Sequence, residues 1–168
     1  NTASGSESTV GGGQYNTASS YYATVGGGRY NASSGDDSTI GGGYTNTASG
    51  NGSFIGGGSD NQASNQYATV GGGYLNIASG GYAVISGGNS NEATSDYSTI
   101  GGGQSNRATA YGSIVSGGAG NIGSGVYSTV SGGSSNTASG YLYGKSTVGG
   151  GYENTASADY STVSGGTL

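Results

Sequence analysis

The chain of 168 residues contains no Cys, His, Pro, Met or Trp. Without Cys it can form neither a disulfide framework nor a thiolate metal site. Without His, its many Ser and Thr hydroxyls have no candidate base to activate them as nucleophiles. We therefore expect a protein that is not an enzyme and that needs no cofactor.

Charged side chains are also scarce, with three Lys and Arg against eight Asp and Glu, for a net charge of −5. Arg29, Arg107 and Lys145 cannot supply the basic patch that nucleic-acid binding requires. No Asp column follows the glycines, as it does in the calcium-binding β-roll. No apolar run is long enough to span a bilayer. We expect no nucleic-acid partner, no metal and no direct membrane insertion.

Glycine is abundant, with 41 residues, whereas hydrophobic residues make up only 30% of the chain. This apolar content is low for an ordinary compact core. A unit reading S-T-V-G-G-G-x-x-N-x-A-S-G-x-x repeats along the chain instead. Its glycine core begins at positions 11, 26, 41, 56, 71, 86, 101, 116, 131, 149 and 164. Nine of the ten intervals are 15 residues and one is 18.

Such a period indicates one stacked structural element, so we expect residues 1–168 to form a single repeat array. The 18-residue interval places a three-residue insertion in the turn at 141–145. The chain begins and ends within the repeat pattern, so we expect it to be a segment of a longer fibre.

Each repeat contains two short apolar patterns of the kind that form strands. One position is always Val or Ile, from Val10 to Val163, and the position two residues earlier is always Ser or Ala. A mostly Ala position likewise follows an invariant Asn by two residues. Side chains two apart on a strand share a face, so we place these columns inside. The prediction is an all-β fold, a parallel β-solenoid or β-roll with one 15-residue repeat per turn, two short strands per rung and about 11 rungs.

The Asn column shows no exception. Stacked rungs lie about 4.7–4.9 Å apart, a spacing at which Asn amides can hydrogen-bond along a ladder. We interpret the column as structural. The predicted ladder consists of Asn16, Asn31, Asn46, Asn61, Asn76, Asn91, Asn106, Asn121, Asn136 and Asn154.

The two outward columns differ in character. The position after each Asn varies freely, including Glu92 and Arg107, as expected of a solvated face. The other outward position, here named the threonine column, is Thr in eight of eleven rungs and otherwise only apolar. We expect it to pack against another copy of the chain. The threonine column comprises Thr9, Thr24, Thr39, Phe54, Thr69, Val84, Thr99, Ile114, Thr129, Thr147 and Thr162.

Tyrosines recur at the second turn of the repeat, where the insertion also falls. They could stack between rungs as edge packing, or they could contact a sugar or another surface. The insertion could be neutral drift or a recognition loop. Candidate surface-recognition residues are Tyr22, Tyr67, Tyr82, Tyr97, Tyr127, Tyr141, Tyr143 and Tyr160.

The repeat Tyr97-Ser98-Thr99-Ile100-Gly101, followed by Asn106-Arg107-Ala108-Thr109, resembles the head repeats of the YadA-like trimeric autotransporter adhesins. Those repeats share the small residue, the β-branched residue followed by Gly, and the Ala-containing second half. The glycine-rich arrays of bacterial and phage tail-fibre proteins are similar. The resemblance implies a trimeric, left-handed parallel β-roll on a cell or virion surface, used for adhesion. The chain departs from the adhesin pattern by its additional Gly and by its Asn.

We therefore expect a non-enzymatic, extracellular structural fibre or adhesin segment. It would be a rigid rod that associates with copies of itself, as a trimer or a longer fibre. A host-surface protein or glycan is a further candidate partner. Two alternatives remain: an ice-binding solenoid using the threonine column, and a carbohydrate-binding surface using the tyrosine edge.

Overall fold

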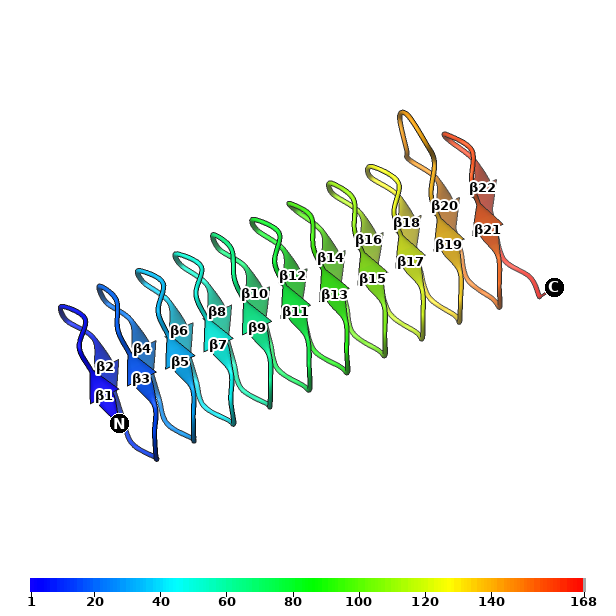
Figure 1. Cartoon of the computed structure of the whole chain (residues 1–168). Coiled ribbons are helices and arrows are strands. Elements are labelled where there is room, and N and C mark those ends of the chain that lie inside the picture. The colour runs from blue at the N-terminus through cyan, green and yellow to red at the C-terminus, as the bar shows by residue number, and fades with distance from the viewer. Residues whose placement is uncertain (168) are drawn as a thin grey trace.

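A computed structural model describes residues 1–167 and shows a stack of short rungs (Figure 1). The rungs follow one another along a single axis, and the two ends of the chain lie at opposite ends of the stack. Each rung contributes two strands of two residues, giving two sheets of 11 strands. The predicted β-solenoid is confirmed.

Sheet 1 contains the residues that follow each Asn. Its strands are β1 (Thr2–Ala3), β3 (Thr17–Ala18), β5 (Ala32–Ser33), β7 (Thr47–Ala48), β9 (Gln62–Ala63), β11 (Ile77–Ala78), β13 (Glu92–Ala93), β15 (Arg107–Ala108), β17 (Ile122–Gly123), β19 (Thr137–Ala138) and β21 (Thr155–Ala156).

Sheet 2 contains the threonine column and the adjoining Val or Ile. Its strands are β2 (Thr9–Val10), β4 (Thr24–Val25), β6 (Thr39–Ile40), β8 (Phe54–Ile55), β10 (Thr69–Val70), β12 (Val84–Ile85), β14 (Thr99–Ile100), β16 (Ile114–Val115), β18 (Thr129–Val130), β20 (Thr147–Val148) and β22 (Thr162–Val163).

All neighbouring strands are parallel and pair equivalent residues, as in Thr69 with Val84 and Val70 with Ile85. The insertion leaves this alignment intact, because Thr129 pairs with Thr147 and Val130 with Val148 across the longer rung. A third ladder of isolated parallel bridges runs from Gln14 to Thr167, one position per rung. The sequence pattern does not predict this third ladder, since its residues share no chemical type.

The core is narrow and consists of the predicted inward columns. In the interior rungs the Val or Ile of sheet 2 and the Ala of sheet 1 are fully buried, as Ile85 and Ala93 are. β-branched residues suit these strands because their side chains pack well on a pleated surface. The small Ser or Ala column, such as Ala83, is buried beside them. This arrangement leaves the threonine column and the position after each Asn on the outside.

Candidate functional site

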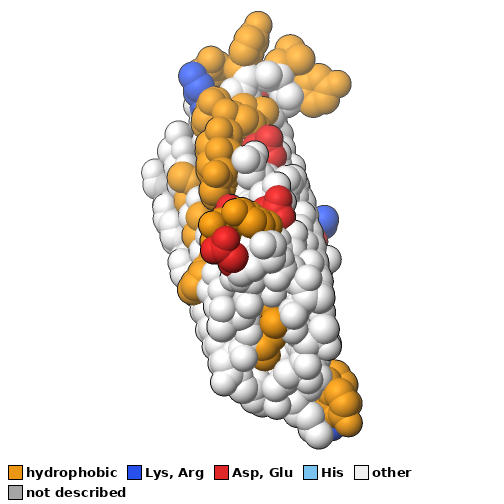
Figure 2. All heavy atoms as spheres, turned by 90° about the vertical axis from the view of Figure 1, so that its left-hand side faces the viewer, with side chains coloured by type: hydrophobic (Ala, Val, Ile, Leu, Met, Phe, Trp, Pro, Cys, Tyr) orange, Lys and Arg blue, Asp and Glu red, His pale blue; other side chains and the backbone are white. Residues whose placement is uncertain are grey.

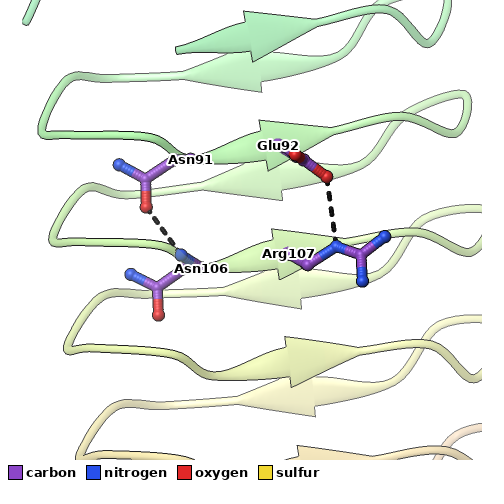
Figure 3. Close-up of polar contacts among 4 residues, drawn as sticks. All are labelled: Asn91, Glu92, Asn106 and Arg107. Atoms are coloured by element: carbon purple, nitrogen blue, oxygen red, sulfur yellow. Dashed lines mark hydrogen bonds and ion pairs between the residues drawn. The ribbon is translucent and has the colours of Figure 1, made fainter. Parts of the chain in front are cut away.

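The Asn side chains form a continuous internal ladder. The Nδ2 of Asn91 donates to Gly87 O at 3.1 Å, to Gly103 O at 3.0 Å and to Asn76 Oδ1 at 3.0 Å. The backbone N–H of Asn106 then donates to Asn91 Oδ1 at 3.0 Å (Figure 3). Both side chains are fully buried. Since their polar atoms are paired within the chain, the ladder serves the fold and offers no ligand site.

The glycine turn, defined as residues 11–13 and their equivalents, lies directly beside this ladder. The third glycine of every turn except the last, at Gly166, is required sterically. Gly58 has φ +86°, and a Cβ there would lie 2.1 Å from Gly73 O and 2.8 Å from Asn61 Nδ2. Positive φ and close backbone approach are the two conditions that favour glycine.

The middle glycine, by contrast, has open space where a Cβ would be. Around a Cβ placed on Gly57, only Gly42 O lies as near as 4.0 Å. This column nevertheless contains Gly in all eleven rungs, whereas the first position of the turn is Ser in four. The sequence alone contains this difference, since the middle position is invariant and the first position is not.

The threonine column faces outward along sheet 2. Its members are half-buried or exposed in the single chain, and its largest apolar members, Phe54 and Ile114, are 42% and 41% exposed. No member carries a charge. The structure therefore places on one face the residues that the sequence predicts to pack against another copy.

The outward column of sheet 1 differs chemically from the threonine column. Arg107 Nε lies 3.1 Å from Glu92 Oε2, and both side chains are exposed (Figure 3). Exposed ion pairs of this kind stabilise a fold by about 0–1 kcal/mol. The pair shows that this face accepts charged groups, which is typical of a solvated surface.

Five tyrosines form an unbroken aromatic run at the second turn. Ring centroids are 5.1 Å apart for Tyr67 and Tyr82, 5.1 Å for Tyr82 and Tyr97, 5.3 Å for Tyr97 and Tyr111, and 5.5 Å for Tyr111 and Tyr127. Neighbouring rings contact one another, yet each of the five side chains remains 43–53% exposed. Figure 2 shows hydrophobic side chains gathered in lines along the rod, among few charged groups.

Tyr111 is not among the candidate tyrosines predicted from the sequence. It stands one position before the tyrosine column, where Gly112 replaces the usual Tyr, and its ring bridges Tyr97 and Tyr127. A second group, also missed, stacks near the glycine turn, with Tyr15 and Tyr30 centroids 5.0 Å apart. Its members occupy the position before each Asn. That position varies in residue type from rung to rung, so the sequence does not identify them.

Three phenols titrate above their usual range. The hydroxyl of Tyr21 raises the pKa of Tyr22, with smaller effects from burial, Glu7 and Asp37. Burial chiefly raises the pKa of Tyr111, with Tyr127 and Tyr97 adding to it. A hydrogen bond with Glu153 chiefly raises the pKa of Tyr152. These phenols are therefore neutral at physiological pH.

The inserted loop projects the most exposed large hydrophobic side chains of the described residues. Tyr141, Leu142 and Tyr143 are 89%, 70% and 65% exposed. Asp159 from the next rung holds the loop backbone, since its Oδ1 accepts from Leu142 N and Gly144 N at 3.0 Å each. The loop thus presents an apolar tip on a fixed base. Tyr160, in the same rung as Asp159, lies 6.4 Å from Tyr143 between ring centroids.

Residues 1–167 contain no group of three or more potential metal ligands and no helix long and apolar enough to cross a membrane. The fold defines the chain as a parallel β-solenoid repeat protein. Comparison with known proteins finds no matching family model and no matching curated protein.

Proposed function

We propose that the chain is a non-enzymatic segment of an extracellular fibre or adhesin, in which rods associate with copies of themselves through the threonine column. The observation that carries the proposal is the contrast between the two outward faces. The threonine column is uncharged in every rung and exposes Phe54 and Ile114, while the outward column of sheet 1 carries Glu92 and Arg107.

The thin core supports the same proposal. An interior rung buries one Val or Ile together with small residues only. Ordering the backbone opposes folding, and glycine loses more conformational freedom than other residues. Burial of the threonine column between rods would offset part of this cost. The trimeric state and the location on a cell or virion surface rest on the resemblance of the repeat to adhesin heads.

Sedimentation equilibrium of the chain and of two paired variants tests the proposal. We expect the parent chain to associate and the Phe54→Asp/Ile114→Asp variant to dissociate at the same concentration. The matched control, Ile77→Asp/Ile122→Asp, places the same charges on the outward column of sheet 1 and should associate like the parent. A well-folded parent that stays monomeric at every concentration would contradict the proposal.

The inserted loop supports recognition of a host-surface protein or glycan as a second candidate function. Its exposed Tyr141 and Tyr143 have more accessible rings than the stacked Tyr82 and Tyr97. A glycan array probed with the parent chain, with Tyr141→Ser/Tyr143→Ser and with Tyr82→Ser/Tyr97→Ser distinguishes binding by the inserted loop from binding by the tyrosine edge. Loss of binding in the first variant alone would place recognition in the loop, and loss in the second alone would place it on the tyrosine edge.

Ice binding has weaker support, because Phe54, Val84 and Ile114 interrupt the threonine column. A thermal-hysteresis measurement tests it directly. Activity that disappears in Thr24→Lys/Thr39→Lys would support it, and no activity at high concentration would remove it.

A further inference from the structure

The glycine turn leaves peptide groups unpaired in every rung. Across residues 1–167, no N–H of a middle or third glycine donates a hydrogen bond within the chain. The carbonyl at the first position of the turn likewise accepts none in the part of the chain described. In the rung at 46–60, these groups are the Gly56 C=O and the N–H groups of Gly57 and Gly58. The parallel ladder therefore skips one whole peptide group per rung.

The residues that carry these groups are accessible from outside the rod. The first and third positions of each glycine turn are exposed, and the middle position is half-buried except at Gly165, which is exposed. Unpaired backbone groups are tolerated where water reaches them, and they are available to any partner that brings acceptors and donors. We name the row formed by the eleven middle glycines, with the unpaired groups beside them, the glycine strip.

In seven of the eleven rungs, nothing within the single chain explains why the middle position is glycine. In four rungs, at Gly102, Gly132, Gly150 and Gly165, φ lies between 145° and 155°, a range that favours glycine. In the other seven rungs φ lies outside the left-handed region, and the nearest atom to a Cβ there is 3.8 Å or more away. Close approach of an external surface to the backbone would explain the glycine, because any side chain at this position would prevent that approach.

We propose that the glycine strip is the place where the backbone of a second copy of this chain makes direct contact with the rod. The strip offers N–H donors and a C=O acceptor in each rung. The same strip on another copy can therefore accept from these donors and donate to this acceptor. A surface that pairs with itself in this way is what an isologous interface between two identical subunits requires.

Spacing and charge favour a second copy over other occupants. A partner that contacts eleven consecutive rungs must repeat at the strand spacing, so that its groups stay in step over about 50 Å. The chain itself has this repeat, and the strip has no charged side chain that would select an ionic ligand. Each middle glycine is three residues from the threonine column, at most about 10 Å away along the chain. The two columns can therefore form one continuous interface.

This inference rests on the proposed self-association, and the following experiment separates the two. Gly57→Ala/Gly72→Ala/Gly87→Ala adds methyl groups to three adjacent rungs at positions with open space. Thr47→Ala/Gln62→Ala/Ile77→Ala changes the same three rungs on the outward column of sheet 1. Sedimentation velocity gives the association constant, and circular dichroism checks that each variant is folded.

We expect the glycine variant to keep its β-sheet signal while its association weakens at least tenfold, and the control to associate like the parent. Gly58→Ala should instead lose the fold, because its Cβ would meet Gly73 O at 2.1 Å. A parent that associates together with a glycine variant that associates equally well would overturn the inference and leave the proposed function standing. A monomeric parent would overturn both.

Amide hydrogen exchange gives a second readout that needs no variant. Middle-glycine amides have no acceptor within the chain, so they should exchange fast in the dilute monomer and become protected on association. Protection that falls on dilution supports the strip as the contact. Fast exchange in the associated form would overturn it, and so would protection that persists in the monomer.

Discussion

The two turns of each rung are built on different principles. The glycine turn is nearly identical in all rungs, and the buried Asn ladder connects it to the rungs on either side. The tyrosine turn, defined as residues 4–7 and their equivalents, varies in residue type and takes a three-residue insertion at 141–145. Its rungs are linked by backbone hydrogen bonds such as Tyr82 N to Gln66 O, 2.8 Å, and by surface ring contacts.

This difference shows where a solenoid accepts change. A turn whose carbonyls receive hydrogen bonds from a buried side chain must keep its length, because any added residue moves those carbonyls away from the donor. A turn whose side chains lie in solvent can lengthen, provided that the strands on either side keep their register. The alignment of Thr129 with Thr147 across the insertion is an example.

The largest expected effect comes from inserting the same three residues in either turn. Gly-Ser-Gly placed between Gly72 and Gly73 should destabilise the fold by about 3 kcal/mol or more, because the Asn61 and Asn76 bonds to these glycines are lost. The same insertion between Gly80 and Gly81 should cost about 1 kcal/mol or less. Urea denaturation followed by circular dichroism measures both. Equal losses would show that the two turns do not differ in tolerance.

Substitution of an Asn in the ladder should give the next largest loss of stability. Asn91→Ala should cost about 3 kcal/mol, since it removes three hydrogen bonds donated by the buried amide and leaves carbonyl groups unpaired. Glu92→Ala, at the adjacent residue, should cost less than about 1 kcal/mol, because it breaks only an exposed ion pair. Thermal denaturation of the two variants at matched protein concentration tests the difference. Similar melting temperatures would contradict the structural role of the ladder.

Ring contacts at the tyrosine turn should stabilise the fold less than the Asn ladder does. Tyr97→Asn should lower stability by about 1 kcal/mol, because Tyr97 packs between Tyr82 and Tyr111. Asn tolerates the positive φ of 57° at this position, so the change tests the ring and not the backbone. Tyr141→Asn, at an exposed loop tip, is the control and should leave stability unchanged. Denaturant midpoints measured side by side decide the question.

The smallest expected effect is a loss of stability at alkaline pH. The pKa values of Tyr22, Tyr111 and Tyr152 are raised in the folded chain above the usual 10.0. Their contribution is complete below pH 10 and is lost as the pH rises through the folded pKa values. Melting temperature measured from pH 8 to pH 12 should fall above pH 10. Tyr111→Phe should reduce that fall, and an unchanged profile would assign it to other groups.

The periodic columns made most of the fold predictable. Val or Ile at one position, Ser or Ala two residues earlier, and Ala two after Asn are enough to define two strands and their inward faces. Equal intervals then set the register, since a stacked repeat must pair equivalent residues. The third ladder through Gln14 and the bridging position of Tyr111 were not predictable in this way. Both depend on how the backbone turns between columns, and neither position has a consistent residue type.

The candidate surfaces were only partly accessible from the sequence. The threonine column is visible because its exceptions are all apolar. The unpaired peptide groups of the glycine turn are not visible, because hydrogen bonds that a backbone fails to make leave no mark on residue type. Only the middle glycine, invariant beside a first position that accepts Ser, signals that this turn has a second constraint.

The stacking of the rungs also has a mechanical consequence. The chain ends lie at opposite ends of the stack, so a pull on them acts along the axis and can detach one rung at a time (Figure 1). A folded rung adds about 4.8 Å to the length of the rod, whereas its fifteen residues extend to about 50 Å when released. Each rung can therefore lengthen about tenfold before the covalent chain bears the load. In single-molecule force spectroscopy, the rod should give a series of equal extensions, with one longer step from the 18-residue rung.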